Sequence, residues 1–196
     1  SYFLLIDMHH IVSDGVSEGI LASDFMALYE GRELPAIKLQ YRDFTEWQNR
    51  LLDSDEQKKQ EAYWLQEFSG EIPVLQLPAD YPRPDVQGAE GSTVMFAVGA
   101  RETRILKAFS MMEDVTMFML ALAIYNIFLH KVSGQEDIVV GTPVAGRRHE
   151  DLEPLVGMFV NMLSIRNYPK GDETFSDLLA LVKKQTVAAF DNQEYQ

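Results

Sequence analysis

The chain has 196 residues, of which 17 are Lys or Arg and 30 are Asp or Glu, so its formal net charge at pH 7 is −13. This acidic balance argues against a nucleic-acid-binding protein, whose electrostatic footprint is a basic patch. The absence of cysteine excludes disulfides, thiolate zinc sites and cysteine nucleophiles. With 46% hydrophobic and 24% charged residues the composition is typical of a globular protein. No apolar run reaches the roughly 18 residues of a membrane span, so we expect a cytoplasmic protein.

The N-terminal residues predict a strand, a polar turn and a helix in direct succession. Residues 2–8 (YFLLIDM) are apolar with little alternation, as in a strand covered on both faces. The polar segment 9–15 follows, and then a helical pattern runs from about residue 16 to residue 29. Such a turn presents side chains at the mouth of an α/β sheet, where ligands bind. Neither an initiator Met nor a signal peptide begins the chain, so we expect a piece of a longer polypeptide.

Two further helical patterns cover residues 41–53 and 55–68. Four prolines and three glycines between residues 69 and 91 then predict a linker. The remaining expected elements are a strand at 92–98, a helix at 101–112, a buried apolar helix at 115–132, strands at 137–144 and 158–165, and an amphipathic helix at 175–190. Two mixed segments separated by a linker indicate two lobes.

The strongest candidate for chemistry is the pattern His9-His10-x-x-x-Asp14-Gly15. A histidine with a pKa of about 6.5 is mostly neutral at pH 7 and can act as a general base. Asp14 could bond an imidazole or brace the turn, and Gly15 could leave room for a ligand or adopt a positive φ. On an extended segment the two histidines point to opposite faces, so only one would face a given cleft. The alternative is a structural or surface histidine pair.

Other catalytic patterns are absent from the sequence. His130 and His149 lie in unrelated contexts and no His-Glu-x-x-His occurs, so we expect no metal site. Neither a Gly-x-Ser-x-Gly elbow nor a P-loop is present. If the protein is a transferase, direct attack of one substrate on the other is therefore more economical than an acyl-enzyme.

Four segments resemble motifs of one family in the family's own order. Residues 8–17 (MHHIVSDGVS) resemble the active-site motif of condensation domains of non-ribosomal peptide synthetases, which have the chloramphenicol-acetyltransferase-like fold. Residues 41–47 (YRDFTEW), 156–166 (VGMFVNMLSIR) and 192–195 (NQEY) resemble later motifs, although Met162 replaces the usual Thr and the last motif normally continues into Pro-Phe-Glu. The family's earlier motifs, including two basic segments, have no counterpart here.

The resemblance implies an α/β (α+β) two-layer sandwich of which this chain is an internal fragment. Residues 1–34 would supply the last strand and helix of the N-terminal lobe with the His-His turn. Residues 35–91 would form a helical pair and the Pro-rich linker. Residues 92–196 would form the C-terminal lobe, truncated at its end.

The implied activity is amide bond formation between a carrier-bound acyl or peptidyl donor and a carrier-bound aminoacyl acceptor, in bacterial antibiotic or lipopeptide biosynthesis. Both substrates would arrive as phosphopantetheine thioesters on upstream and downstream peptidyl carrier domains, beside an adenylation domain. The domain would bind no cofactor and no metal of its own. The sequence of residues 13–17 (SDGVS) resembles that of condensation domains that accept an L-configured donor more than that of their relatives.

The resemblance also implies roles for single residues around the turn. His10 would lie in the tunnel between the lobes and take or position the proton of the acceptor amine, or orient the amine electrostatically. His9 would pack or form hydrogen bonds within its lobe. Asp14 would be structural and paired with an arginine upstream of this chain, so that here it must bind water or another cation. Gly15 would offer its N–H near the reacting carbonyl.

Further candidates lie outside the His-His turn itself. Asn161 and Arg166 would belong to the crossover that closes the tunnel floor, with Asn161 bonded to loop backbone, and Ser17 is a third tunnel or structural candidate. Tyr41 and Trp47 would be core anchors. The pair 147–148 (RR) reads as a solvated loop or as part of the lobe interface.

Two other functions compete with condensation. An epimerization domain of the same fold would use His10 to move an α-proton, and a non-catalytic docking module would only hold carrier domains. In either case we expect the isolated fragment to be inactive and to self-associate through an exposed apolar face.

Overall fold

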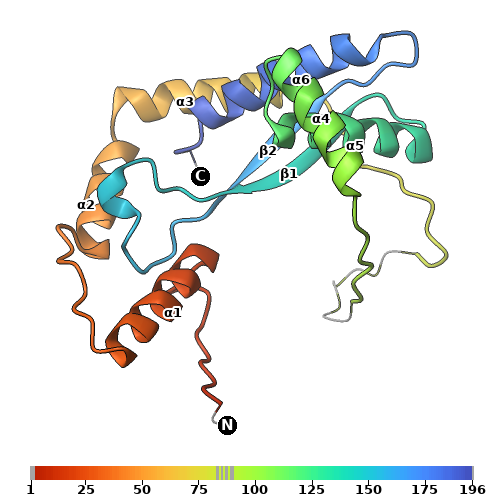
Figure 1. Ribbon diagram of the computed structural model, residues 1–196. Coiled ribbons are helices and arrows are strands. Elements are labelled where there is room, and N and C mark those ends of the chain that lie inside the picture. The colour runs from red at the N-terminus through yellow and green to blue at the C-terminus, as the bar shows by residue number, and fades with distance from the viewer. Residues whose placement is uncertain (1–2, 83, 85, 87, 89–90, 196) are drawn as a thin grey trace. The chain divides into compact units, whose positions relative to one another are not determined.

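The computed structural model describes residues 3–82, 84, 86, 88 and 91–195. Six α-helices, one short 3-10 helix and two strands follow one another in these residues (Figure 1). In chain order they are α1 (Gly15–Tyr29), α2 (Tyr41–Leu52), α3 (Asp55–Glu67), α4 (Ala100–Met112), α5 (Met117–Ser133), β1 (Ile138–Val144), η1 (Glu150–Leu152), β2 (Asn161–Asn167) and α6 (Phe175–Asp191).

The helices begin and end where local chemistry satisfies their terminal backbone groups. Ser54 and Thr116 precede α3 and α5, and their side chains accept N–H bonds from the first turn. The carboxylate of Asp43 accepts the N–H of Gln40 at the start of α2. Gly134 ends α5 with φ of 72°, a left-handed conformation that favours glycine. These signals are local, and all six helices predicted from the sequence are confirmed to within two residues at each end.

The two strands form a two-stranded sheet in the order β1-β2. They confirm the strands predicted near residues 137–144 and 158–165, although β2 starts three residues later than expected. The strands predicted at 2–8 and 92–98 are wrong for the described residues, because residues 3–8 and 92–98 have no regular secondary structure and pair with no strand. Their apolar side chains are exposed, with Phe3 at 98% and Phe96 at 88%. An apolar run signals a preference for burial, but a strand also needs a partner.

The described chain divides into two compact units, each with its own core. Unit 1 comprises Ser1–Ser69, Gly141–Leu163 and Asp191–Gln196. Its core cluster is built from Phe44 of α2, Leu152 of η1, Leu155 and Phe159. The ring of Phe159 lies 4.6 Å from that of Phe44 and 5.1 Å from that of Tyr41, measured between centroids. Aromatic packing thus fixes α2 against the loop that joins β1 to β2.

Unit 2 comprises Gly70–Val140 and Ser164–Phe190. Its fully buried side chains come from α5, α6 and both strands, and include Leu120, Leu179, Val182, Ile138 and Ile165. The prediction that the helix at 115–132 is buried holds for one face only. Three apolar side chains on the other face are 46 to 55% exposed, namely Ile124, Tyr125 and Phe128.

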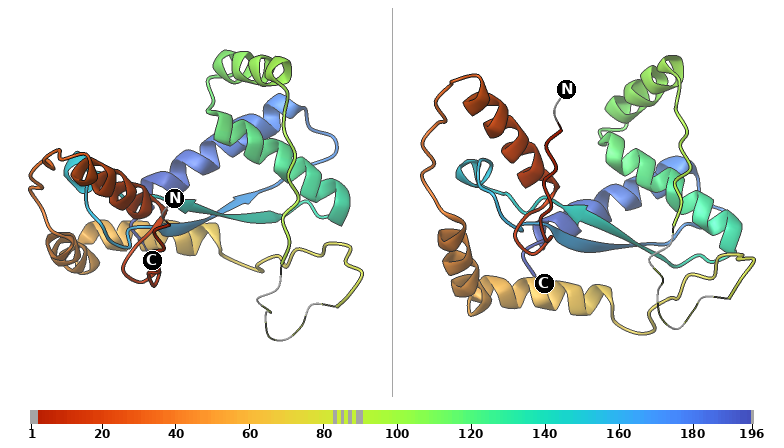
Figure 2. Two further views of the ribbon diagram at one scale, coloured as in Figure 1. Left: turned by 60° about the horizontal axis from the view of Figure 1, so that its bottom comes forward. Right: turned by 90° about the horizontal axis from the view of Figure 1, so that it is seen from below.

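Among the described residues, no single helix is both long and apolar enough to cross a membrane. Only α4 and α5 taken together have the length and apolar composition of a membrane span, and these two helices are bent by 104° relative to each other (Figure 2). The bend lies within unit 2, where the ring of Phe118 in α5 contacts that of Phe190 in α6 edge-on.

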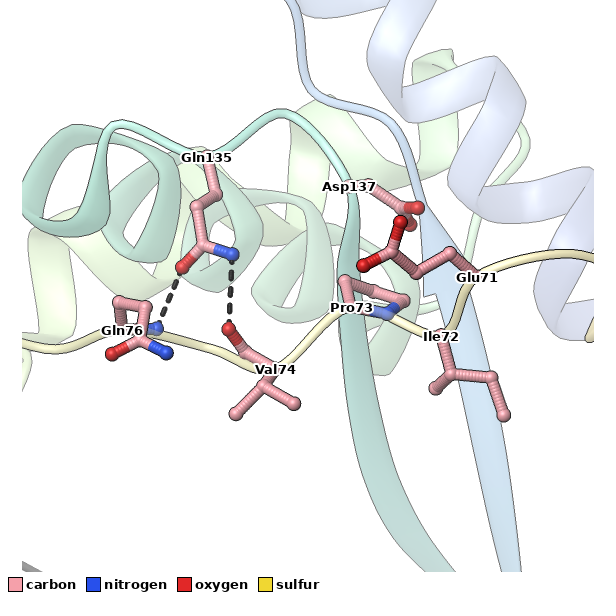
Figure 3. Close-up of a pocket in the computed structure, with 7 residues that line it drawn as sticks. All are labelled: Glu71, Ile72, Pro73, Val74, Gln76, Gln135 and Asp137. Carbon is pink, nitrogen blue, oxygen red and sulfur yellow. Dashed lines mark hydrogen bonds between the residues drawn. The ribbon is translucent and has the colours of Figure 1, made fainter.

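A pocket of about 400 Å³ lies in unit 2 beside the extended segment after residue 70 (Figure 3). The side-chain amide of Gln135 holds this segment in two places. Its Oε1 accepts the N–H of Gln76 at 2.6 Å, and its Nε2 donates to the carbonyl of Val74 at 3.1 Å (Figure 3). The two carboxylates of the pocket belong to Glu71 and Asp137.

Candidate active site

The two histidines lie on a short closed turn that precedes α1 in unit 1. The N–H of Val12 donates to the carbonyl of His9 at 3.1 Å, and the N–H of Ile11 donates to Nδ1 of the His9 ring at the same distance. His9 is exposed and so is not packed within its lobe, but its imidazole is hydrogen-bonded within its own turn. His10 is exposed to solvent, so its imidazole is open to a reactant.

Asp14 anchors this turn to α1. It is the N-cap of the helix, is 1% exposed, and accepts the N–H of Ser17 at 2.8 Å and the hydroxyl of Ser17 at 2.7 Å. A third bond comes from the N–H of Phe159 at 3.1 Å. Burial raises the pKa of the Asp14 carboxyl, but the bonds from Ser17, Phe159 and Arg147 outweigh it and hold the pKa below its usual value. The carboxylate is therefore ionised at neutral pH.

Arg147 is the cation that pairs with Asp14. Its Nη2 lies 3.1 Å from Oδ1 of Asp14, and the exposed fractions of the two side chains are 4% and 0%. Its Nη1 donates to the carbonyls of Leu152 and Leu155, both at 2.6 Å, and its guanidinium carbon lies 4.0 Å from the ring centroid of Phe159. The interpretation of Arg147 as part of a solvated loop is therefore wrong. Of the two alternatives expected for Asp14 in this chain, water or another cation, the structure shows the cation, 133 residues after the carboxylate.

Sequence reasoning missed this pair because nothing local links the two residues. The available signal was the 147–148 (RR) pair, next to the motif that begins at residue 156. Its second member, Arg148, is half exposed and lies 3.5 Å from a carboxylate oxygen of Glu194. One residue of the pair thus serves the buried network and the other remains near the surface.

Gly15 is the first residue of α1 and is exposed. Its φ is not positive, and a Cβ built on it would meet nothing within 4 Å. The alternative in which this glycine serves a left-handed turn is therefore wrong. The structure supports the other alternative, in which the missing side chain of Gly15 leaves open space beside the backbone.

The other motif residues of unit 1 converge on the loop around residue 157. The hydroxyl of Tyr41 donates to the carbonyl of Met158 at 2.8 Å. Burial and the charge of Asp14 raise the pKa of this phenol, which keeps it a neutral donor. Trp47, the second expected core anchor, is 46% exposed and contacts the ring of Phe44 at 5.8 Å.

Asn161 holds the last described segment of the chain. Its Nδ2 lies 2.8 Å from the carbonyl oxygen of Gln193 and 3.2 Å from that of Tyr195. The side-chain oxygen of Gln60 accepts the N–H groups of Glu194 and Tyr195. Residues 192–195 are therefore fixed in unit 1 by side chains from α3 and β2.

Arg166 belongs to unit 2, so the structure does not bring it into the unit that carries His10. Its Nε and Nη2 form a bidentate pair with the carboxylate of Asp137, at 2.8 and 2.6 Å, and Nη2 also donates to the carbonyl of Glu71 at 3.1 Å. These contacts join β2, the start of β1 and the linker segment within that unit.

No group of three His, Asp or Glu side chains is placed to hold a metal ion in the part of the chain that the structure describes. What unit 1 offers instead is an exposed imidazole on a turn whose far end is fixed by a buried, charged hydrogen-bond network. That arrangement can accept and release a proton at a defined place.

Comparison with known proteins places this chain in a family. The family model described as the condensation domain matches residues 1–196. Bacitracin synthase 3 of Bacillus licheniformis is 48% identical over 195 residues, and tyrocidine synthase 3 of Brevibacillus parabrevis is 49% identical over 194 residues. These matches cover 100% and 99% of this chain but 3% of each relative, so the chain spans a small part of either synthase.

Solved structures agree with the same fold. The X-domain in its complex with OxyB from teicoplanin biosynthesis has a TM-score of 0.84 at 26% identity, with 95% of this chain and 44% of that chain covered. Holo-AB3403, a four-domain nonribosomal peptide synthetase bound to AMP and glycine, also has a TM-score of 0.84, at 28% identity, with 95% and 14% covered. The first condensation domain of the calcium-dependent antibiotic synthetase shares the fold at 24% identity and a TM-score of 0.78, with 96% and 42% covered.

The expected chloramphenicol-acetyltransferase-like fold is confirmed by these matches, and the chain covers less than half of each single-domain structure. The motifs, the fold and the sequence relatives agree, and the chain belongs to the condensation-domain family of non-ribosomal peptide synthetases.

Proposed function

We propose that this chain is the part of a condensation domain that carries the base for amide bond formation between two carrier-bound substrates. The observation that supports this most directly is the contrast between His10, which is exposed, and Asp14, which is 1% exposed and bonded on both oxygens. The imidazole of His10 is accessible to a substrate, and the buried Asp14 four residues later holds the turn that positions it.

The reaction would proceed by direct attack. The amine nitrogen of the acceptor attacks the carbonyl carbon of the donor thioester, the C–N bond forms, and the C–S bond breaks. His10 takes the amine proton, which ends on the departing sulfur, so that no charge is left on the enzyme. A general base of this kind contributes about 10² to 10⁴ in rate. The space beside Gly15 would leave its N–H accessible to the carbonyl oxygen.

The substrates would be phosphopantetheine thioesters on upstream and downstream peptidyl carrier domains, with an adenylation domain adjacent. No cofactor is needed, because the thioester itself activates the acyl group. The cytoplasmic location also stays a prediction from the sequence. Since the chain covers 42% of the solved condensation domain that it matches, we expect activity only in a completed domain, in which this chain is joined to the remainder of its condensation domain.

A non-catalytic docking role is the second candidate. It is favoured by one observation: the X-domain, among the structures with a TM-score of 0.84, is described in a complex with another protein, OxyB. A domain of this fold can therefore serve as a binding platform. In that role the identity of residue 10 would not matter.

The test is amide formation by the completed domain, followed by mass spectrometry with donor and acceptor loaded on carrier proteins. We expect product with the parent domain, and a loss of at least about a hundredfold with His10→Ala. His149→Ala is the control, because His149 is also an exposed histidine and lies in the same unit as His10.

Three outcomes distinguish the candidates. Amide formation that depends on His10 and not on His149 supports condensation. A racemised donor thioester in the absence of an acceptor would instead indicate epimerization. Amide formation that is indifferent to His10→Ala, or carrier binding without any product, would refute the assigned base and favour the docking module.

A further inference from the structure

Ser17 makes a set of contacts that the proposed chemistry does not use. Its side chain is fully buried, at 0% exposed, in the first turn of α1. Its hydroxyl oxygen lies 2.7 Å from Oδ1 of Asp14, 2.9 Å from the carbonyl oxygen of Gly157, 3.0 Å from the nitrogen of Gly157, and 3.1 Å from Nη2 of Arg147. One hydroxyl is thus shared by four polar groups from three parts of unit 1.

The bonding capacity of a hydroxyl decides how these contacts are used. It has one proton and two lone pairs. The N–H of Gly157 and Nη2 of Arg147 can only donate, so they occupy the lone pairs. The proton then goes to the carboxylate of Asp14 or to the carbonyl of Gly157, and the charged carboxylate at the shorter distance is the stronger acceptor. Every bonding position of the hydroxyl is therefore filled.

Gly157 has close contacts with Tyr41 as well as with Ser17. Gly157 is itself buried, and a Cβ at this position would lie 2.1 Å from the Tyr41 ring. The backbone of Gly157 therefore has little room beside Tyr41 and is hydrogen-bonded through both its N–H and its C=O to Ser17. If the hydroxyl is removed, the buried N–H of Gly157 loses the partner that the structure gives it.

We propose that Ser17 is a positioning residue for His10. The inference rests on the proposed function and adds to it the means by which the base is held. The exposed imidazole takes its position from the backbone that leads to Asp14, and Asp14 takes its own from Ser17 and Arg147. Through Ser17 the loop at Gly157 and the first turn of α1 move as one body, and the turn that carries His10 is fixed to both.

The experiment compares variants of the completed domain in two assays. Steady-state amide formation gives kcat and KM, and hydrogen exchange followed by mass spectrometry gives the protection of residues 9–14 and 156–159. For Ser17→Ala we expect kcat to fall by about 10- to 100-fold with KM within about twofold, as for a reactive group displaced by a fraction of an ångström. Exchange should accelerate in both segments and stay unchanged in α6.

Three variants serve as controls. Ser110→Ala removes another buried serine hydroxyl, which donates only to the carbonyl of Lys107 in α4, and should leave kcat and both exchange segments unchanged. Val182→Ala opens a cavity in the core of unit 2 and lowers the stability. It therefore shows how much of a change in kcat comes from a general loss of stability. Tyr41→Phe frees the carbonyl of Met158 on the same loop without touching α1, so its effect on kcat should be smaller than that of Ser17→Ala.

The outcomes separate this inference from the proposed function. If His10→Ala abolishes the product while Ser17→Ala leaves kcat unchanged, Ser17 is not a positioning residue although His10 is the base. If Val182→Ala and Ser17→Ala lower the stability equally and also lower kcat equally, the loss of kcat reflects stability alone and the inference is refuted. If the parent domain makes no amide at all, the proposed function fails, and the exchange of residues 9–14 in Ser17→Ala still decides whether the hydroxyl holds the turn.

Discussion

The replacement of Arg147 by methionine tests the network at its most buried point. The substitution removes the cation from a pair in which the side chain of Asp14 is 0% exposed and that of Arg147 is 4% exposed. It also removes the donor from the carbonyls of Leu152 and Leu155. Breaking a buried ion pair on one side costs about 3 to 5 kcal/mol. Because two buried carbonyls lose their donor as well, we expect Arg147→Met to lower the free energy of unfolding by about 4 kcal/mol.

The cost should depend on pH in a defined direction. The folded-state pKa of Asp14 is held below its usual value, so the ionised carboxylate contributes stability that is present above the unfolded pKa and is lost as pH falls through the folded pKa. Arg147→Met removes one of the lowering contacts and leaves the burial, so the pKa of Asp14 rises in the variant. The difference in stability between the two proteins should therefore shrink as pH falls through the higher pKa of Asp14 in the variant towards its lower pKa in the parent.

Urea unfolding of the completed domain from pH 3.5 to pH 7.5, at about half-unit steps, measures both effects. Arg148→Met is the control, because Arg148 is 52% exposed and its contact with Glu194 is at 3.5 Å. It should cost at most about 1 kcal/mol. The reasoning is refuted if Arg147→Met costs no more than Arg148→Met at pH 7, or if its cost is independent of pH.

Two further substitutions test the packing of the loop and the second unit. Gly157→Ala should destabilise unit 1 by about 1 to 3 kcal/mol and lower the amide formation rate, because the added Cβ would lie 2.1 Å from the Tyr41 ring; unfolding and activity identical to the parent would contradict the close approach. Arg166→Met should cost about 2 kcal/mol, less than Arg147→Met, because its partner Asp137 is 34% exposed and can be hydrated. A urea midpoint for Arg166→Met below that of Arg147→Met would show that exposure of the carboxylate is not the deciding factor.

The helices could be predicted from the sequence because their signals are local. Apolar spacing at a period of 3.6, with Ser54 and Thr116 at the start and Gly134 at the end, is contained in each segment. The strands at 2–8 and 92–98 could not be judged in the same way. A strand depends on a partner that is distant in the chain, and among the described residues Phe3 and Phe96 have none to cover them.

The candidate site shows the same division between local and distant information. The motif around His10 identified the turn and its carboxylate, since both lie within six residues. The cation that neutralises Asp14 lies 133 residues away, and the packing of Gly157 against Tyr41 joins segments 116 residues apart, from 157 − 41. The sequence motif groups Arg166 with Asn161, five residues earlier, yet the division of the chain places them in different units.

Gln135 has a consequence for the association of chains. An extended segment with unpaired N–H and C=O groups on its edge is a template for strand addition by another molecule. At Val74 and Gln76 a single side chain donates to the carbonyl and accepts from the N–H, which are the two bonds that an added strand would make (Figure 3). One glutamine thus occupies the edge at Val74 and Gln76, and another strand could pair there only by displacing it.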